Sequence, residues 1–464
     1  MAPAKTASLG GTAFLSWSAD GRVRVADRGG FVKDGIDGLV RDATFGSGDA
    51  QANARYLIWE GAHELGIVSS SIHDLYVARG QGKVRGFTVP AINIRGPTYD
   101  VARAALRAAK KSNVGGLIFE LAKSEMEYTQ QPPIEYATSI LAAAIKEEWN
   151  QPIFVQGDHF QFSAKRYAAD PAKETQGLRS LVEDAIAGGF HNIDIDASTL
   201  VDLSKPNVPA QQLVNSQLSA DLTQLVRERE PKGTTISVGG EIGEVGKENS
   251  TPDELRAYLD QYGAILHKKT PDAIGVSKVS VQTGTSHGGV VGKDGKVIAV
   301  EVDFETLAEL SEICVKEYRL AGCVQHGAST LPDDLFHKFP DAGTAEIHLA
   351  TGFQNAYFDH PAFPAELKKR IYAHLDQAHA DEMSPKLTKE QFYYRTRKKA
   401  YGPFKRELWD LAPDVKKPLT DALEQRFAFL FRELRVGGTR DAVAKHVRPV
   451  RVRRAAPKSL GSRP

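Results

Sequence analysis

The chain has 464 residues, of which 41% are hydrophobic and 25% are charged, and this composition excludes a collagen-like repeat, a coiled-coil rod and a wholly disordered protein. Lysine and arginine number 59 against 58 aspartates and glutamates, so no strong basic field favours non-specific nucleic-acid binding. Only two cysteines occur, and no stretch reaches about 18 consecutive apolar residues. We therefore expect a cytoplasmic protein that acts on a small polar molecule, with no membrane partner and no specific nucleic-acid partner.

The first 80 residues are irregular in pattern, with one helix expected at 50–66, and we interpret residues 1–80 as an N-terminal extension. From residue 86 onward, short β-type runs alternate with longer amphipathic segments, which is typical of parallel βα units. Eight strands are predicted, at 87–94, 117–121, 153–156, 192–196, 235–239, 273–281, 322–325 and 346–349. Helices are expected between them, including 99–111, 178–187, 252–266 and 304–318.

Eight strands that alternate with helices over roughly 270 residues predict an α/β fold, the closed (β/α)8 TIM barrel. An open doubly wound sheet is less well supported, because no G-x-G-x-x-G turn follows the first strand. We assign the barrel to 81–360 and a C-terminal helical extension to 361–440, with helices at 364–379, 389–401 and 419–434. Residues 441–464 are rich in lysine and arginine, and we expect them to form a disordered tail.

Polar residues follow the predicted strands, at the end of a barrel where catalytic groups gather. His159, His287 and His326 each stand at a strand end, and three imidazoles suffice to bind a catalytic zinc that keeps a position open for substrate. Glu241 or Asp196 would add a fourth ligand or hold a second metal. Asp158 precedes His159, and its carboxylate would either orient a metal ligand or act as a general acid/base.

Glycines and hydroxyl residues follow two of these histidines. The segments are His287-Gly288-Gly289 and His326-Gly327-Ala328-Ser329-Thr330. Glycine lets backbone N–H groups approach an anion closely, and a hydroxyl group supplies another donor. We therefore expect both loops to bind a phosphate group beside the metal.

Four motifs in a fixed order carry a family resemblance. They are Gly-Asp-His at 157–159, Gly-Glu-Ile-Gly at 240–243, Gly-Thr-Ser-His-Gly at 284–288 and His-Gly-Ala-Ser at 326–329. Together with the segment from Val89 to Asn93, they resemble the class II, zinc-dependent ketose-bisphosphate aldolases over about residues 70–355. The resemblance implies a reversible aldol cleavage of a phosphorylated ketose, similar to fructose 1,6-bisphosphate, to dihydroxyacetone phosphate and an aldehyde.

The resemblance also implies roles for individual residues. Zinc would be bound by His159, His287 and His326, with Glu241 and Asp196 matching an alternative or second metal position. Asp158 would exchange a proton with the C4 hydroxyl group of the ketose. The positions expected to contact the substrate, its phosphate or a nearby monovalent cation such as Na+ or K+ are Asn93, Gly288, Gly327, Ser329 and Thr351.

The chain departs from the family pattern at three places. The final strand continues as His348-Leu349-Ala350-Thr351-Gly352, so His348 replaces an asparagine that touches the enediolate, and two substrate-facing acids are absent. The family has a mobile loop after the metal-binding glutamate that supplies a proton-transferring carboxylate, and in this chain Glu248 is the nearest candidate, with Glu244 behind it. Lys123 stands where the family has a Ser/Gly-rich phosphate loop. We expect His348 and Lys123 to contact the substrate.

Two alternative functions stay open at this point. One is a non-catalytic aldolase-like subunit that supports a true aldolase, and the other is a divergent zinc lyase or epimerase that acts on a different sugar. The N-terminal and C-terminal extensions would either cover the outside of the barrel or build a homo-oligomer, and we expect a homo-oligomer.

Overall fold

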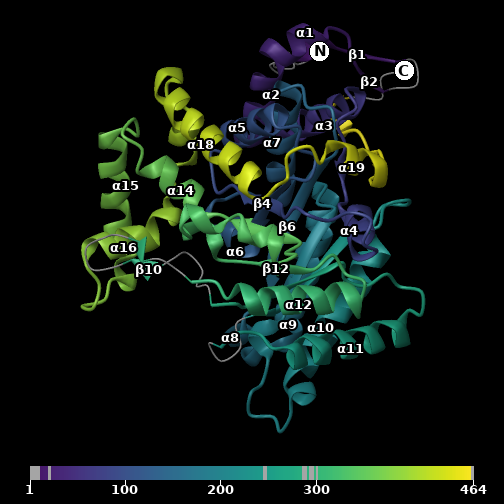
Figure 1. Cartoon of the computed structure of the whole chain (residues 1–464). Helices are drawn as coiled ribbons and strands as arrows, with labels where there is room; N and C mark the ends of the chain where they lie inside the picture. The colour runs from purple at the N-terminus through teal and green to yellow at the C-terminus, as the bar shows by residue number, and fades with distance from the viewer. Residues whose placement is uncertain are drawn as a thin grey trace.

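The computed structural model describes residues 11–18, 22–243, 248–284, 290–291, 297–298 and 301–460. Within these residues, eight parallel strands close into a barrel, because the first strand pairs with the last as well as with the second (Figure 1). In order around the barrel they are β4 (Val89–Asn93), β5 (Ile118–Ala122), β6 (Ile153–Gln161), β7 (Asn192–Asp196), β8 (Ser237–Gly243), β9 (Lys278–Val281), β12 (Cys323–Gln325) and β13 (Glu346–Leu349). Each overlaps one predicted strand, so the predicted TIM barrel is confirmed.

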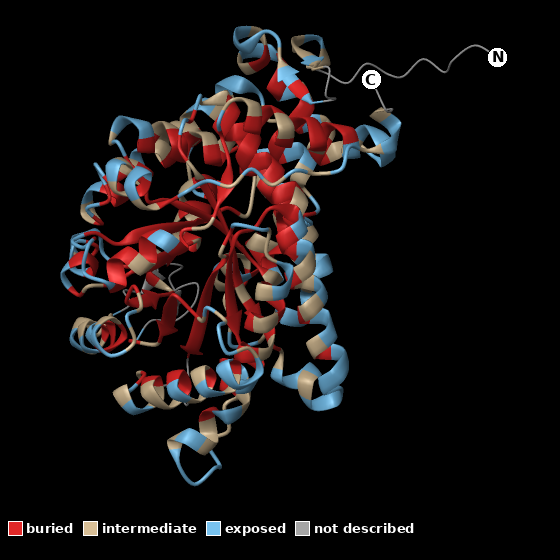
Figure 2. Cartoon of the chain, turned by 90° about the vertical axis from the view of Figure 1, so that its right-hand side faces the viewer, coloured by how far each residue is buried: buried red, intermediate tan, exposed pale blue. Residues whose placement is uncertain are grey.

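The barrel strands are buried on both faces. Every residue of β4, β5 and β7 is buried, as expected for parallel strands whose inner side chains fill the barrel and whose outer side chains contact helices. Figure 2 shows the buried strands at the centre and the exposed residues on the outer helices. Three charged residues, Glu120, Lys278 and Glu346, lie inside these strands with at most 1% of their surface exposed, so each needs a partner of opposite charge or a hydrogen bond.

Helices and short segments connect the strands and cover the barrel. α9 shows how the sequence sets their limits: it begins after Asp170, whose side chain accepts a hydrogen bond from the N–H of Lys173, and ends at Gly189 in the left-handed conformation. The connecting helices are α5 (Thr98–Lys111), α6 (Lys123–Tyr128), α7 (Pro133–Lys146), α8 (Ala164–Ala169), α9 (Pro171–Gly188), α10 (Val208–Arg229), α11 (Pro252–Lys269), α12 (Phe304–Lys316), α13 (Lys338–Asp341) and α14 (Thr351–Phe358). A short antiparallel pair, β10 (Val290–Val291) and β11 (Val297–Ile298), lies between β9 and α12.

The N-terminal extension packs against one side of the barrel. Its elements are β1 (Leu15–Trp17), β2 (Val23–Val25), α1 (Arg28–Gly30), α2 (Ile36–Phe45), α3 (Gly48–Glu64), β3 (Ser69–Ser70) and α4 (His73–Gly80). The expected helix at 50–66 is α3. Both α2 and α3 contact α7, and apolar residues of α2 and α3, such as Leu39 and Trp59, are buried. β3 pairs with β6 next to the barrel.

The C-terminal extension is helical, and its helices are α15 (Ala365–Ala378), α16 (Lys389–Thr396), the 3-10 turn η7 (Arg397–Ala400), α17 (Lys405–Trp409) and α18 (Pro413–Glu433). The helices expected at 364–379, 389–401 and 419–434 correspond to α15, to α16 with η7, and to α18. Figure 1 shows α18, in yellow, beside α5 and α14, and both contacts are present in the packing. In the part of the chain that the structure describes, no helix is both long enough and apolar enough to cross a lipid bilayer.

The basic tail differs from the disordered segment that we expected, over its described residues 441–460. After α19 (Arg440–His446) it runs across α3, where the carbonyl oxygen of Val452 accepts a hydrogen bond of 2.9 Å from Trp59 Nε1. The guanidinium of Arg454 lies 3.5 Å from the centroid of the Trp59 ring and donates to the carbonyl of Ala187 at 3.0 Å. Composition did not predict this docking, because the acceptors belong to distant segments.

Candidate active site and metal centre

The carboxyl ends of the barrel strands surround a cavity of about 510 Å³. The residues that line it include Asp158 and His159 from β6, Glu241 from β8, His326 directly after β12 and His348 from β13, all of them predicted site residues. These residues span 190 positions of the sequence, from Asp158 to His348, yet they share one mouth because the parallel strands of a barrel end on the same side.

A bulge in β6 aims two of these side chains into the cavity. The pairing of β6 with β7 shifts register between Gly157 and Phe160, so Asp158 and His159 together lie opposite the single residue Asp194. His159 has a φ of 41°, which is uncommon for a residue other than glycine. A Cβ atom at Gly157 would lie 2.4 Å from the Phe160 ring, so the bulge requires glycine at this position. The Gly-Asp-His motif therefore has a structural reason as well as a chemical one.

His159, Glu241 and His326 form a group of metal-type donors. One donor atom from each residue lies within 4.8 Å of the other two. His159 Nδ1 lies 3.0 Å from Glu241 Oε2 and 3.3 Å from Asp196 Oδ2, and the imidazole rings of His159 and His326 are 4.2 Å apart. Imidazole nitrogen and carboxylate oxygen are ligands of zinc and related divalent ions. The donor set therefore fits the metal that the sequence predicts.

Asp196 lies behind His159 and is completely buried. Its Oδ1 accepts hydrogen bonds from the backbone N–H and the hydroxyl group of Ser198, at 3.0 and 2.7 Å. Burial tends to raise its pKa, but hydrogen bonding to His159 and Ser198 outweighs burial and lowers the pKa. Burial and the neighbouring Asp196 carboxylate raise the pKa of Glu241 to about 7.

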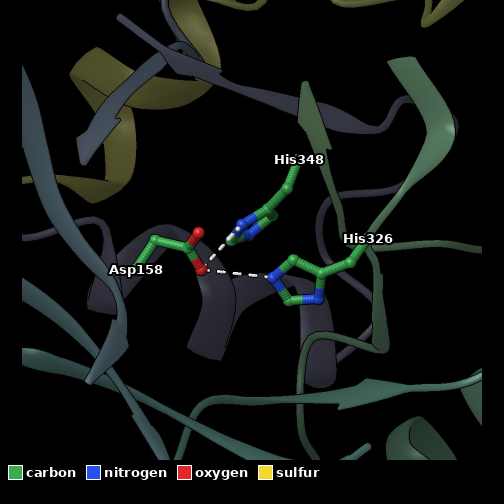
Figure 3. Close-up of side chains that lie close together, drawn as sticks. All are labelled: Asp158, His326 and His348. Atoms are coloured by element: carbon green, nitrogen blue, oxygen red, sulfur yellow. Dashed lines mark hydrogen bonds and ion pairs between the residues drawn. The ribbon is translucent and has the colours of Figure 1, made fainter. Parts of the chain in front are cut away.

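Asp158 lies between two imidazoles. Its Oδ1 is 3.2 Å from His326 Nε2 and 3.2 Å from His348 Nδ1, and Figure 3 shows both rings directed at the same carboxylate oxygen. Burial tends to raise the pKa of Asp158, but the surrounding imidazoles of His159, His348 and His326 outweigh burial and hold the pKa well below its usual range. Asp158 is therefore held in its deprotonated, carboxylate form.

The residues predicted to bind phosphate lie on another part of the cavity wall. Gly327, Ser329 and Thr351 all line the cavity, and Gly327 adopts a φ of 73° that favours glycine. Ser329 Oγ accepts a hydrogen bond of 2.6 Å from the backbone N–H of Ala350, which ties the loop after β12 to the end of β13.

Asn93 and Lys123 also line the cavity. The side-chain nitrogen of Asn93 donates to Glu125, whereas its Oδ1 makes no hydrogen bond with any described residue. Lys123 Nζ donates to the carbonyl of Gln161 at 2.8 Å and lies 3.3 Å from Glu174 Oε1. The unpaired oxygen of Asn93 is thus available to a hydroxyl group of a ligand.

Two predicted site residues, His287 and Gly288, lie outside the described residues. Asp196 contacts His159 but does not itself line the cavity. Glu248 is exposed and is not among the residues that line the cavity.

Charged residues below the mouth received no role in the sequence analysis. Lys278 Nζ, which is completely buried, donates to Gln156 at 2.8 Å and to Asp194 at 3.0 Å and also contacts Glu346. His348 Nε2 lies 2.6 Å from Glu346 Oε1. The sequence did contain a sign of this network, since charged residues interrupt strands that are otherwise apolar. It could not show which of them pair.

Lys398 is a further residue that sequence reasoning missed. It belongs to η7 in the C-terminal extension, yet it lines the cavity together with Arg95 and Tyr128. Its Nζ lies 5.8 Å from the centroid of the Tyr128 ring and makes no ion pair with a described carboxylate. Nothing in the local sequence around Lys398 indicates that it reaches the barrel mouth, so only the folded chain identifies it.

Comparison with known proteins places the chain in a family. The model of the family "fructose-bisphosphate aldolase class-II" matches residues 80–400. The chain belongs to this family. A fructose-bisphosphate aldolase from Thermus caldophilus is 25% identical over 306 residues, which are 65% of this chain and 80% of that protein. The resemblance carried by the four motifs is thereby confirmed, and family membership supports aldolase-type, aldehyde-lyase chemistry.

The chain was also compared with solved structures. A structure named as a probable tagatose 6 phosphate kinase from Sinorhizobium meliloti 1021 has a TM-score of 0.51 and 15% identity, covering 77% of this chain and 93% of that chain. A fructose-bisphosphate aldolase from Campylobacter jejuni has a TM-score of 0.46 and 16% identity, covering 80% of this chain and 96% of that chain. The Sinorhizobium meliloti structure supports the barrel fold. At 15% identity it supports no conclusion about function.

Proposed function

We propose that this member of the class II aldolase family is a zinc-dependent aldolase that cleaves a phosphorylated ketose of the fructose 1,6-bisphosphate type into dihydroxyacetone phosphate and an aldehyde. The observation that carries the proposal is the position of Asp158, a buried carboxylate 3.2 Å from His326 and beside the donor set of His159 and Glu241. An acid/base group next to a metal-type donor set inside one cavity is what a metal-assisted aldol cleavage needs.

The residues that would hold the zinc are His159 and His326, with His287 proposed as the third imidazole and Glu241 as a carboxylate ligand. Asp196 would orient His159 or hold a second metal position. When bound, the zinc would polarise the ketose carbonyl group and stabilise the negative charge of the enediolate.

Asp158 would carry the proton transfer at the carbon–carbon bond. In the cleavage direction, its carboxylate accepts the proton of the C4 hydroxyl group, the C3–C4 bond breaks, and C4 becomes the aldehyde carbon. The low pKa of Asp158 keeps it deprotonated for this step. We retain Glu248 as the proposed second proton-transferring carboxylate, which would have to approach the cavity from its exposed position.

The cavity wall offers contacts for a substrate with phosphate at both ends. Gly327, Ser329 and Thr351, with Gly288, would bind the ketose phosphate or a monovalent cation (Na+ or K+) near it. Cationic residues gather elsewhere on the wall and would attract the other phosphate: Lys123, Arg166 and Lys398. Asn93 would accept a hydrogen bond from a substrate hydroxyl group through its unpaired Oδ1.

The test is a cleavage assay that measures dihydroxyacetone phosphate released from fructose 1,6-bisphosphate. We expect release that stops when a chelator removes the metal and returns when zinc is added. A protein that binds zinc but releases no dihydroxyacetone phosphate from this ketose would contradict the substrate and favour a divergent lyase or epimerase on another sugar. Chelator-resistant cleavage would contradict the metal dependence.

The proposal also includes a homo-oligomer acting in the cytoplasm. The extensions cover parts of the barrel surface through α2, α3 and α18, and the remaining helix surfaces would supply the subunit contacts. Light scattering of the purified protein would report the oligomeric state.

A further inference from the structure

We propose that His348 is a metal ligand, and that the mouth contains a second cation position formed by Asp158, His326 and His348. The first position, formed by His159, Glu241 and His326, belongs to the proposed aldolase site. The second does not follow from family membership, because the class II pattern has an asparagine where this chain has His348. Its occupant would be a divalent first-row ion such as Zn2+ or Co2+, since the donors are imidazole nitrogens and a carboxylate oxygen.

The distances within the group match those around a bound ion. One donor atom from each of Asp158, His326 and His348 lies within 4.8 Å of the other two, and both nitrogen–oxygen separations to Asp158 Oδ1 are 3.2 Å (Figure 3). Two ligand atoms that each lie about 2.0–2.2 Å from a shared ion, at angles between a right angle and tetrahedral, are separated by about 3.0–3.4 Å. Both imidazole nitrogens are thus spaced from Asp158 Oδ1 as two ligands of one ion are.

The Nδ1 atom of His348 is a buried nitrogen without a hydrogen bond among the described residues. The residue is only 5% exposed and lines the cavity, and Nδ1 lies 2.9 Å from Glu120 Oε2 and 3.2 Å from Asp158 Oδ1. A cation placed between Nδ1 and these carboxylates would bind to both the nitrogen and the carboxylate oxygens.

The opposite nitrogen of His348 is fixed in the way that metal-binding histidines are. Its Nε2 lies 2.6 Å from Glu346 Oε1. Glu346 is in turn held by Lys278, by the hydroxyl group of Tyr76 and by Gln156 Nε2 at 2.7 Å. A ligating histidine usually donates its second N–H to a carboxylate, which sets the tautomer. Donation from Nε2 to Glu346 leaves the Nδ1 lone pair facing Asp158.

His326 determines how the two positions are related. Its Nδ1 is 2.6 Å from Ser280 Oγ, so only Nε2 is directed at the donors of the mouth. One nitrogen binds one ion at a time. The two positions are therefore alternatives for a single ion, which can move between the His159 side and the His348 side while it stays bound to His326.

The test is Co2+ binding to the metal-free protein, followed by the visible absorption of the bound ion and by competition with a chelator. The variants are H348N, H159N and the double variant, with H337N at an exposed histidine as the control. We expect H159N to retain a Co2+ site, and H348N to change the Co2+ spectrum. We expect the double variant to bind Co2+ at least about 10-fold more weakly than H159N.

Unchanged Co2+ affinity and spectrum on adding H348N, both in the wild-type protein and in H159N, would overturn the proposal. That result would mean that His348 is an imidazolium held between Glu120 and Glu346. Far-UV circular dichroism of each variant would establish that the barrel is folded. Because these measurements use no substrate, they are independent of whether fructose 1,6-bisphosphate is cleaved.

Discussion

The two ring nitrogens of His326 make different contacts. Its Nδ1 lies 2.6 Å from Ser280 Oγ, which fixes the ring, while Nε2 faces Asp158 at 3.2 Å. Burial and the neighbouring imidazoles of His348 and His159 lower the pKa of His326 well below the usual value. The ring is therefore neutral, which is the form in which a histidine nitrogen binds a metal.

Asp158 is expected to be the acid/base residue whose loss is most damaging. We expect Asp158→Asn to lower kcat about 100-fold to 10,000-fold, because an amide cannot accept the C4 hydroxyl proton. The measurement is cleavage of fructose 1,6-bisphosphate by zinc-loaded protein, with Asp334→Asn at an exposed site as the control. A kcat within a factor of ten of the wild-type value would show that the proton goes elsewhere.

Lys398 is expected to act on substrate affinity. We expect Lys398→Met to raise KM for fructose 1,6-bisphosphate about 10-fold, with a smaller effect on kcat, because one charge-assisted hydrogen bond to phosphate contributes about 1.5–3 kcal/mol. The matched control is Lys399→Met, since the neighbouring Lys399 pairs with Glu382 at 2.6 Å and does not line the cavity. Equal KM values for the two variants would remove Lys398 from the substrate site.

Strands β9 and β13 both pair with β12, and a buried ion pair also connects them to each other. Lys278 on β9 contacts Glu346 on β13 and Asp194 on β7, and all three are buried. We expect Lys278→Met to lower the free energy of unfolding by about 3–5 kcal/mol, because it leaves two buried carboxylates without their cation. Urea-induced unfolding measures the change.

The control for this variant is Lys316→Met on the exposed face of α12, where the pair with Glu312 is solvent-exposed. An exposed ion pair contributes at most about 1 kcal/mol. If both variants unfold at the same urea concentration as the wild-type protein, the buried network does not stabilise the barrel.

The strand positions could be predicted from the sequence because each buried strand is a short apolar run between turns. Their limits were less accurate. The strand predicted at 153–156 extends to Gln161, since the bulge at Asp158 and His159 interrupts the apolar pattern without ending the strand. The strand predicted at 273–281 begins only at Lys278. The apolar pattern of a segment indicates only which of its own residues are buried. A bulge also depends on pairing with the neighbouring strand, so the pattern could not predict it.

The candidate site was predictable to the extent that its residues follow strands directly. His159, Glu241 and His326 were found in this way and meet at the mouth. Lys398 was not predicted. It belongs to the C-terminal extension, 240 residues after Asp158 in the sequence, and reaches the cavity only in the folded chain. Contacts of that range depend on the packing of the whole chain.

At the scale of the whole molecule, both extensions hold to the barrel and to each other. The tail crosses α3 through the contact of Arg454 with Trp59, and α18 packs along α5.

Three histidines are buried in this region and in the adjoining barrel end: His63, His73 and His191. Burial lowers the pKa of each to about 4, with positively charged arginines adding to the effect.

These histidines make stability depend on pH. Each is neutral in the folded chain, whereas in the unfolded chain it takes up a proton below its usual pKa of 6.5. The free energy of unfolding is therefore not reduced by these histidines above pH 6.5. It decreases as the pH falls from 6.5 towards 4, by about 1.4 kcal/mol per pH unit for each histidine. We expect His73→Gln to reduce the slope of unfolding free energy against pH, and exposed His337→Gln to leave it unchanged. Equal slopes in all three proteins would contradict buried neutral histidines.

We infer that the barrel mouth is a metal centre organised around His326, which belongs to both donor groups. Elemental analysis of the purified protein and of its His326→Asn variant would test for this metal centre. We expect about one zinc ion per chain in the wild-type protein, because the two positions share His326 as a ligand. We expect the His326→Asn variant to lose most of this zinc. A folded wild-type protein without metal after zinc loading, or a variant that retains all of its zinc, would contradict the account.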